Sequence, residues 1–266
     1  MDRSSPSAYL VDLDGTLYVD RAAVLGAVAA LARLRDREVP FRLVTNTTSR
    51  SRAMLVERLR VLGFQVAPEE LFTAPLAAVA LARAEGYSRA VPLLPPGAHP
   101  DLAPLELRGG TSGHEPPAGW RADVVLIGDL GALWNHELMQ EAFEHLMAGA
   151  ALVALSRDRY WRKDGRLTLD AGPFVAGLEY ATGLHAAVAG KPSPQFYASA
   201  LEAMGSPPPR EVAMIGDDLW SDVAGAQSAG VQGWLVRTGK FRPEALFTAR
   251  VAPDRILDSV AELEGG

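Results

Sequence analysis

The sequence predicts an α/β fold, in which helices cover both faces of a parallel β-sheet and a second α/β domain is inserted into the chain. Short apolar runs of strand length alternate with helical patterns along most of the sequence, which favours parallel strands joined by helices. A Pro- and Gly-rich stretch interrupts this alternation near the middle, and a fresh set of strands and helices follows it. The interruption indicates the inserted domain.

Length and composition narrow the classes of protein that this chain could be. With 266 residues, 48% of them hydrophobic, it can bury a large core in one or two domains. The formal net charge of −6, with arginines scattered rather than clustered, predicts no nucleic-acid partner. Cysteine is absent, which excludes disulfides and thiolate zinc sites. No signal core follows residues 1–7, and no uncharged apolar stretch reaches the roughly 20 residues of a membrane span, so we expect a cytoplasmic protein without membrane contact.

Six short apolar runs are predicted to be strands, and several are bounded by Gly, Pro, Asp or Asn. They are Ala8 to Leu13, Phe41 to Val44, Val124 to Ile127, Ala151 to Leu155, Val212 to Ile215 and Gly233 to Val236. Apolar residues three or four positions apart mark two helix faces, which are expected to pack on cores. The first face comprises Val24, Val28, Leu31 and Leu34, and the second comprises Leu138, Ala142, Phe143 and Leu146.

We expect residues 75–183 to fold as an inserted domain, and residues 1–74 and 184–266 to form the main domain. The insert contains the Pro- and Gly-rich sequence "PLLPPGAHPDLAPLELRGGTSGHEPPAGW". The alternative is one continuous sheet with a long loop, which is less favoured because loops of that length are uncommon in compact domains.

Polar residues gather where the predicted strands end. Ligand sites of parallel sheets lie beyond the carboxyl ends of the strands, so these side chains are expected to share one crevice. They are Asp12 and Asp14 in "YLVDLDGTLYVD", Thr45 and Asn46 after the second run, Lys191 in "GKPSP" before a helix that starts near Pro194, and Asp217, Asp218 and Asp222 in "GDDLWSD".

Taken one at a time, these residues have simpler interpretations as helix caps, turn residues or a surface charge. Together they favour a cation, because unpaired carboxylates in one crevice repel one another. Oxygen ligands without His or Cys suit a hard ion, and Mg²⁺ typically takes one or two carboxylates, several waters and a phosphate. An ionised aspartate can then attack phosphorus once the metal and a lysine have neutralised the charge of the substrate. The residues therefore predict a Mg²⁺ site and an aspartate nucleophile.

The motifs "DLDGT", "TN", "GKP" and "GDDLWSD", in that order, resemble the four motifs of the haloacid dehalogenase-like hydrolase superfamily. The insert resembles the type-two cap of its subfamily IIA, and the resemblance covers nearly the whole chain. Within that subfamily, "GKPSPQFYASAL", "VAMIGDDLWSDVAGAQSAG" and "VRTGKFRP" look most like the phospholysine phosphohistidine inorganic pyrophosphate phosphatases and related hydrolase-domain proteins. This resemblance implies a Rossmann-like three-layer core with a parallel sheet and an α/β cap domain.

The resemblance also implies a role for each motif residue. Asp12 matches the nucleophile that becomes an aspartyl-phosphate and binds Mg²⁺, and Asp14 matches the general acid, whose backbone carbonyl also binds the metal. A poor alkoxide leaving group needs a proton in the transition state, and the same carboxylate can later activate the water. The remaining matches are Thr45, Asn46 and Lys191 for binding the substrate phosphate, Asp217 for the metal, and Asp218 and Asp222 for orienting the metal waters or Lys191.

Other residues near the motifs are expected to have no chemical role. Gly15 lets the chain turn at the strand end, and Thr16 is expected to be structural. The five histidines show no metal-ligand spacing.

The predicted function is a Mg²⁺-dependent phosphatase of small phosphate monoesters, with pyrophosphate as a further candidate substrate. A phosphotransferase or mutase would share every motif, so this alternative stays open until products are analysed. A halide-releasing dehalogenase would need neither Asp14 as the acid nor Asp217 as a ligand, and a non-enzymatic phospho-receiver would need neither the insert nor Asp14. Both rank lower.

The insert is expected to act as a lid that selects the substrate, because the core motifs contact only phosphate and metal. Its candidate contacts lie in "GDLGALWN" and "SRDRYWRKDG", with Asp129, Arg157 and Tyr160 as positions to test. Trp134 is expected to pack within the cap rather than to stack on the substrate. A roofed site favours small phosphoesters over phosphoproteins, and a homodimer is kept open as the assembly.

Overall fold

The computed structural model describes residues 6–163 and 166–263, and the chain divides into two compact units. The first unit consists of three segments, 1–45, 55–72 and 191–266, and the second of two segments, 46–54 and 73–190. Each unit has a large β-sheet of its own. The alternative of one continuous sheet with a long loop is therefore wrong.

The second unit is larger than the insert of residues 75–183 that the sequence predicts. It takes in residues 46–54, where the backbone N–H of Ser51 donates a hydrogen bond of 2.8 Å to the carbonyl of Gly97. It also takes in residues 184–190, which contain a strand of its sheet. Tertiary contacts, rather than the position of the Pro-rich stretch, set the bounds of this unit.

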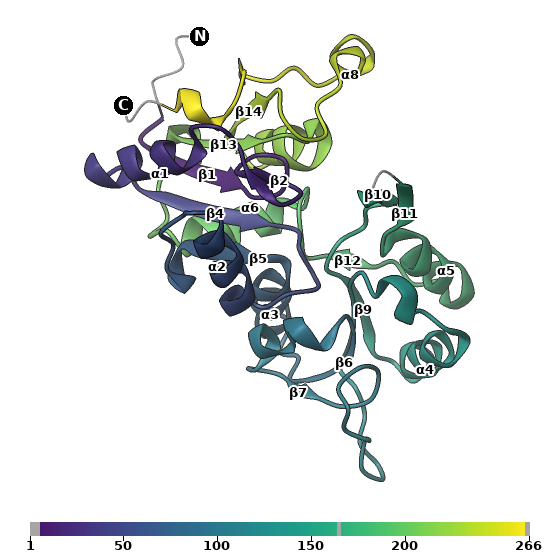
Figure 1. The fold of residues 1–266 in the computed structure, drawn as a ribbon. Helices are drawn as coiled ribbons and strands as arrows, with labels where there is room; N and C mark the ends of the chain where they lie inside the picture. Colours follow the sequence, from purple (N-terminus) through teal and green to yellow (C-terminus); the bar gives the residue numbers. More distant parts are fainter. Residues whose placement is uncertain (1–5, 164–165, 264–266) are drawn as a thin grey trace. The chain divides into compact units, whose positions relative to one another are not determined.

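The first unit is built around a six-stranded sheet with the strand order β15-β14-β13-β1-β4-β5 (Figure 1). The central strand β1 consists of five buried residues and runs parallel to both of its neighbours. The register pairs Asp12 of β1 with Val44 of β4, and Val11 of β1 with Ile215 of β13, so the carboxyl ends of these three strands lie side by side. The strands are β1 (Ala8–Asp12), β4 (Phe41–Thr45), β5 (Leu71–Thr73), β13 (Val212–Gly216), β14 (Gln232–Val236) and β15 (Arg255–Leu257).

Helices cover both faces of this sheet. Helices α1 (Ala27–Asp36) and α2 (Arg52–Val61) pack on a core that includes Tyr9 and Trp234. Side chains alternate between the faces of a strand, so Gly233 faces the other way. There it lies so close to the next helical segment that an added Cβ would be 2.8 Å from the carbonyl of Val223. That segment is the π-helix η5 (Leu219–Ala224), so it covers the second face of the sheet. The remaining elements of the unit are β2 (Tyr18–Val19), β3 (Ala22–Ala23), η1 (Pro68–Glu70), α6 (Pro194–Glu202), η4 (Pro209–Glu211), α7 (Gly225–Ser228), α8 (Pro243–Thr248) and η6 (Val260–Glu262).

The predicted apolar face of α1 is partly wrong. The helix begins at Ala27, so Val24 precedes it, and Val28 is 37% exposed. Ala residues complete the buried face instead of Val28, because their small side chains allow close packing on the sheet. The buried residues of α1 are Ala27, Ala30, Leu31 and Leu34.

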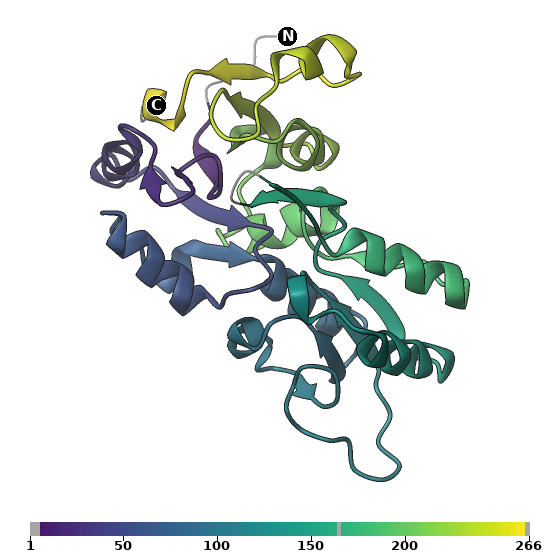
Figure 2. The ribbon, with the colours of Figure 1, turned by 45° about the vertical axis from the view of Figure 1, so that its right-hand side comes forward.

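The second unit has a five-stranded sheet with the strand order β12-β9-β8-β6-β7. Helices α4 and α5 lie side by side (Figure 2) and share one core with the sheet, in which Leu146 of α4 and Val175 of α5 are buried. The second predicted helix face is confirmed, since Ala142 and Leu146 are buried and Leu138 and Phe143 pack against the same core. The elements are α3 (Ala74–Ala84), β6 (Arg89–Leu93), η2 (Pro96–Leu102), β7 (Glu106–Leu107), β8 (Val124–Ile127), η3 (Gly131–Leu133), α4 (His136–Met147), β9 (Ala151–Ala154), β10 (Tyr160–Lys163), β11 (Arg166–Leu169), α5 (Gly172–Thr182) and β12 (Ala187–Val188).

All six predicted strands are present, as β1, β4, β8, β9, β13 and β14, and the parallel-sheet α/β class is confirmed. Among the described residues, five further strands of the two sheets escape sequence analysis because they are short, polar or interrupted by proline: β5 has three residues, β7 and β12 have two each, β6 contains Pro92, and β15 begins at Arg255. None of the described helices combines the length and the apolar character that crossing a membrane requires.

Candidate active site

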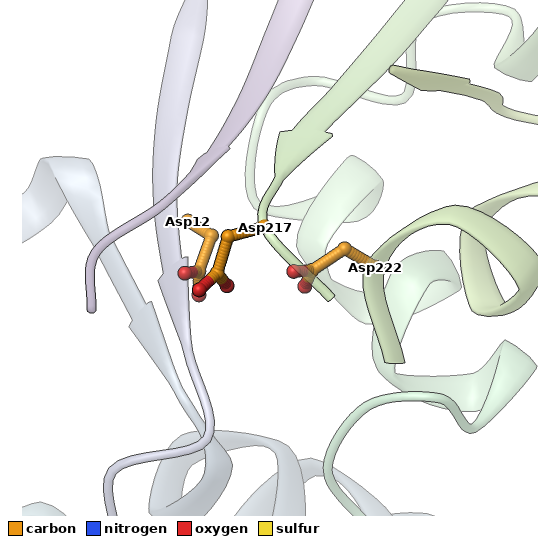
Figure 3. A group of neighbouring side chains, drawn as sticks. All are labelled: Asp12, Asp217 and Asp222. Atoms are coloured by element: carbon orange, nitrogen blue, oxygen red, sulfur yellow. The ribbon is translucent and has the colours of Figure 1, made fainter. Parts of the chain in front are cut away.

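Three buried carboxylates meet at the carboxyl edge of the six-stranded sheet. Asp12 is the last residue of β1, Asp217 directly follows β13, and Asp222 lies in η5. One oxygen atom of each lies within 4.8 Å of the others, and the side chains of Asp12 and Asp217 point to the same place (Figure 3). The three residues are only 5%, 4% and 1% exposed, so their charges are poorly solvated.

Lys191 lies between two of these carboxylates. Its Nζ donates one hydrogen bond of 2.6 Å to Asp12 Oδ1 and another of 2.6 Å to Asp222 Oδ1. Burial disfavours the ammonium, but the charges of Asp12 and Asp222 more than offset this, and the pKa of Lys191 is raised well above its ordinary value. Lys191 is therefore a fixed cation beside Asp12.

The charges of this group suit a divalent cation. Burial raises the pKa of Asp12 in spite of Lys191, and the neighbouring carboxylates raise it further. The pKa of Asp217 is raised to about 7, by burial first and by the charge of Asp222 second. The oxygens of Asp222 accept hydrogen bonds from Lys191 and from the backbone N–H of Asp218 (3.1 Å), and its side chain lies apart from the other two carboxylates (Figure 3). Asp12 and Asp217, whose side chains point to the same place, are the carboxylates that best fit Mg²⁺, which prefers oxygen ligands.

The turn after β1 brings two more side chains into the group. The hydroxyl of Thr16 is fully buried and donates to Asp12 Oδ2 at 3.4 Å, a contact that can orient the carboxylate and agrees with the structural role that we expected for this residue. Asp14 is exposed, and its carboxylate accepts a hydrogen bond from the hydroxyl of Tyr18. The pKa of Tyr18 is raised, by burial first and then by the charge of Asp14. The carboxylate of Asp14 can thus reach solvent while that of Asp12 cannot.

Thr45 and Asn46 follow the strand that pairs with β1. Thr45 ends β4, is 2% exposed and comes directly after Val44, the register partner of Asp12. Asn46 belongs to the second unit, where its Oδ1 would lie 2.6 Å from a Cβ added at Gly190. The part that both residues play in binding phosphate stays a prediction.

Asp218 is primarily a helix cap. Its Oδ1 accepts hydrogen bonds from the backbone N–H groups of Trp220 (2.9 Å) and Ser221 (3.0 Å) at the start of η5. Its Oδ2 lies 3.5 Å from Lys240 Nζ. These contacts fix the entry into the segment that carries Asp222, so Asp218 acts on the group through the backbone.

Sequence reasoning missed two contributors to this group. Tyr197 of α6 is buried, and its hydroxyl donates to the carbonyl of Ser221 (2.5 Å). Residues 238–240 follow β14, and the backbone N–H of Lys240 donates to Asp217 Oδ2 at 2.6 Å. The sequence "RTGK" directly after a predicted strand is the same signal that identified the other strand ends, whereas Tyr197 has no signal beyond its place in an apolar helix face.

In the second unit, most of the predicted substrate contacts have structural partners. Arg157 forms an ion pair of 2.6 Å with Glu179, and Asp129 Oδ2 accepts a hydrogen bond of 3.1 Å from the indole of Trp161. Trp134 stacks on Phe174 with ring centroids 4.1 Å apart, so it packs within the unit. Tyr160 of the β10–β11 hairpin is 51% exposed.

We expect Lys191→Met to destabilise the folded protein by about 3–5 kcal/mol, because it leaves two buried carboxylates without their shared cation. Urea unfolding without added metal at pH 8 measures the change. Arg237→Ala is the matched control, because it removes an ion pair with Asp258 in which the two side chains are 55% and 79% exposed. It should lower the free energy of unfolding by about 1 kcal/mol or less. Equal stability of Lys191→Met and the wild type would mean that the carboxylates do not depend on this ammonium.

Comparisons with known proteins identify the family to which this chain is similar. A family model of the haloacid dehalogenase-like hydrolases matches residues 9–106, and a second model of HAD-hydrolase-like proteins matches residues 188–263. Haloacid dehalogenase-like hydrolase domain-containing protein 2 of Bos taurus is 42% identical over 90% of this chain and 87% of that relative. Phospholysine phosphohistidine inorganic pyrophosphate phosphatase of Homo sapiens is 38% identical over 95% of this chain and 91% of that relative.

Solved structures agree with the sequence relatives. The 4-nitrophenylphosphatase of Thermotoga maritima superposes with a TM-score of 0.85 and 27% identity, covering 97% of this chain and 95% of that chain. The strand-end carboxylates, the buried lysine and the similarity over 90% of the chain lead to one conclusion: the chain belongs to the haloacid dehalogenase-like hydrolase family.

Proposed function

We propose that this protein is a Mg²⁺-dependent phosphatase that hydrolyses small phosphate monoesters through an aspartyl-phosphate on Asp12. The observation that carries the proposal is the buried ammonium of Lys191, 2.6 Å from the carboxylate of Asp12 and beside a second strand-end carboxylate, Asp217. This group supports the proposal because it brings together a carboxylate that can attack phosphorus, an ammonium that can bind phosphate and carboxylates that can bind a metal. Two of the similar proteins are named as phosphatases, which supports the same class of reaction.

In the first step, a carboxylate oxygen of Asp12 attacks phosphorus while the bond from phosphorus to the leaving oxygen breaks. Asp14 gives its proton to that oxygen, which leaves as an alcohol. Lys191 fixes the orientation of the Asp12 carboxylate and offers positive charge to the phosphoryl oxygens. When bound by Asp12, Asp217 and the carbonyl of Asp14, Mg²⁺ would offset the negative charge of the substrate.

In the second step, the ionised Asp14 takes a proton from water as the water oxygen attacks the phosphorus of the acyl-phosphate. The bond between phosphorus and the Asp12 oxygen breaks, and inorganic phosphate leaves. Asp14 suits both steps because it is exposed, so it can exchange protons with substrate and solvent. Asp222 keeps Lys191 in place through both steps by its hydrogen bond of 2.6 Å.

We also propose that the second unit acts as a lid that selects the ester. The phosphoryl chemistry above uses side chains of the first unit, so selectivity for the rest of the substrate must come from elsewhere. Tyr160 is the strongest of the predicted contacts because its side chain is 51% exposed, with the Arg159 guanidinium over its ring. By contrast, Asp129 is hydrogen-bonded and Arg157 is ion-paired within their own unit. A lid favours small phosphoesters, pyrophosphate among them, over folded phosphoproteins.

A panel of phosphorylated metabolites and pyrophosphate, assayed with Mg²⁺ beside a few folded phosphoproteins, tests this proposal. We expect release of inorganic phosphate from several small esters and much less from the phosphoproteins. Stoichiometric phosphate release distinguishes a phosphatase from a phosphotransferase or mutase, which would pass the group to an acceptor. Preference for the phosphoproteins, or transfer without phosphate release, would contradict the proposal.

The acid role of Asp14 predicts a dependence on the leaving group. Asp14→Asn cannot donate a carboxyl proton, so kcat/KM should fall by about 10²–10⁴-fold for an alkyl phosphate. The fall should be smaller for an activated aryl phosphate such as 4-nitrophenyl phosphate, whose leaving group needs little protonation. Steady-state kinetics with both substrates measures the ratio, and an equal fall for both would show that Asp14 does not protonate the leaving group.

A further inference from the structure

Residues 238–240, which we call the β14 loop, contact a carboxylate that fits the metal. The backbone N–H of Lys240 donates a hydrogen bond of 2.6 Å to Asp217 Oδ2. Gly239 has a φ of +60°, and a Cβ added to it would lie 2.0 Å from the same oxygen. The close approach of the loop to Asp217 therefore requires a residue without a side chain at position 239.

The same loop also holds the turn that follows β1. The hydroxyl of Thr238 donates a hydrogen bond of 2.5 Å to the carbonyl of Gly15. A Cβ added to Gly15 would lie 1.9 Å from Asp217 Oδ2, and the α-carbon of Gly15 would lie 2.5 Å from a Cβ added to Gly239. The carboxylate of Asp217 is thus enclosed by two glycines, one after each of the two strands, β1 and β14, that pair with β13.

The remaining side chains of this region point elsewhere. Lys240 Nζ lies 3.5 Å from Asp218 Oδ2, its side chain is 56% exposed, and its charge partly offsets the rise in the pKa of Asp217. The guanidinium of Arg237, directly before the loop, pairs with Asp258 at 2.8 Å. The backbone of Gly239 and Lys240 therefore contacts Asp217 directly, whereas the hydroxyl of Thr238 acts indirectly, by holding the carbonyl of Gly15 on the other side of this carboxylate.

We propose that the β14 loop is a positioning segment that fixes the carboxylate of Asp217 relative to the turn after Asp12 and thereby sets the affinity for Mg²⁺. Mg²⁺ demands near-ideal ligand geometry, and groups that orient a ligand typically contribute 10- to 100-fold to metal affinity. The inference rests on the proposed function, because it presumes that Asp217 is a ligand of the catalytic ion.

Thr238→Val tests the proposal with a side chain of nearly the same shape but no hydroxyl. Magnesium chloride is titrated into the full-length protein without substrate, and binding is followed by calorimetry and by the rise in melting temperature. We expect Thr238→Val to bind Mg²⁺ about 10-fold more weakly and Gly239→Ala about 10- to 100-fold more weakly than the wild type. Thr238→Ser, which keeps the hydroxyl, should restore most of the affinity, and Arg237→Ala should bind like the wild type.

The kinetic signature separates positioning from general damage. In both weakened variants, the Mg²⁺ concentration for half-maximal activity should rise by the same factor as the dissociation constant for Mg²⁺. KM for the ester at saturating Mg²⁺ should stay close to that of the wild type. If the wild type binds Mg²⁺ and Thr238→Val and Gly239→Ala bind it equally well, this inference fails and the proposed function stands. If the wild type binds no Mg²⁺, both fail together.

Discussion

Asp12→Asn is expected to abolish turnover of every phosphoester, by at least about 10⁴-fold. The carboxamide preserves the shape of the side chain but has no ionised oxygen to attack phosphorus, so no second group can take over the step. Release of inorganic phosphate from an alkyl phosphate and from 4-nitrophenyl phosphate measures the loss. Both substrates should be affected alike, in contrast to the leaving-group dependence expected for Asp14→Asn.

A covalent test accompanies this variant. During turnover, acid-quenched wild-type protein should carry a phosphoryl group on the peptide that contains Asp12, detected by mass spectrometry, and Asp12→Asn should carry none. Asp258→Asn is the matched control, because that carboxylate is 79% exposed and pairs only with Arg237 among the described ion pairs. Turnover by Asp12→Asn near the wild-type rate, or labelling of another aspartate, would remove Asp12 from the role of nucleophile.

Removal of Mg²⁺ should have the second-largest effect. Asp12, Asp217 and the phosphate of the substrate would bring several negative charges to one poorly solvated place, where Lys191 alone cannot balance them. The share of the metal in stabilising the transition state is several kcal/mol, so activity should be lost in excess chelator. Added Mg²⁺ in excess of the chelator should restore it.

The measurement is phosphate release from one good substrate at a series of free Mg²⁺ concentrations. Asp217→Asn serves as the matched variant, since it keeps the shape of the side chain but weakens one proposed ligand. It should need a higher Mg²⁺ concentration for half-maximal activity. Full turnover of the wild type in excess chelator would show that the carboxylates work without a metal.

Much of the fold could be predicted from sequence because its signals are local. Four of the six predicted strands are unbroken apolar runs, and the other two are interrupted only by Asp12 and by Arg42. A strand buried on both faces by helices needs such a run whatever its neighbours are. The strands that were missed have weaker local signals: β6 contains Pro92, and β15 has only three residues and begins with Arg255. Their pairing with adjacent strands supplies the hydrogen bonds that define them.

The sequence by itself determined which polar residues stand at the strand ends, because Asp12, Thr45 and Asp217 directly end or follow recognisable strands. Only the tertiary structure decided how they are used. Lys191 meets Asp12 across 179 positions of the chain, and Thr238 meets Gly15 across 223. Asp222 accepts hydrogen bonds from Lys191 and from the backbone of Asp218. Apolar periodicity and strand ends are properties of neighbouring residues, whereas hydrogen-bond partners depend on which distant strands lie side by side, and no local pattern encodes that choice.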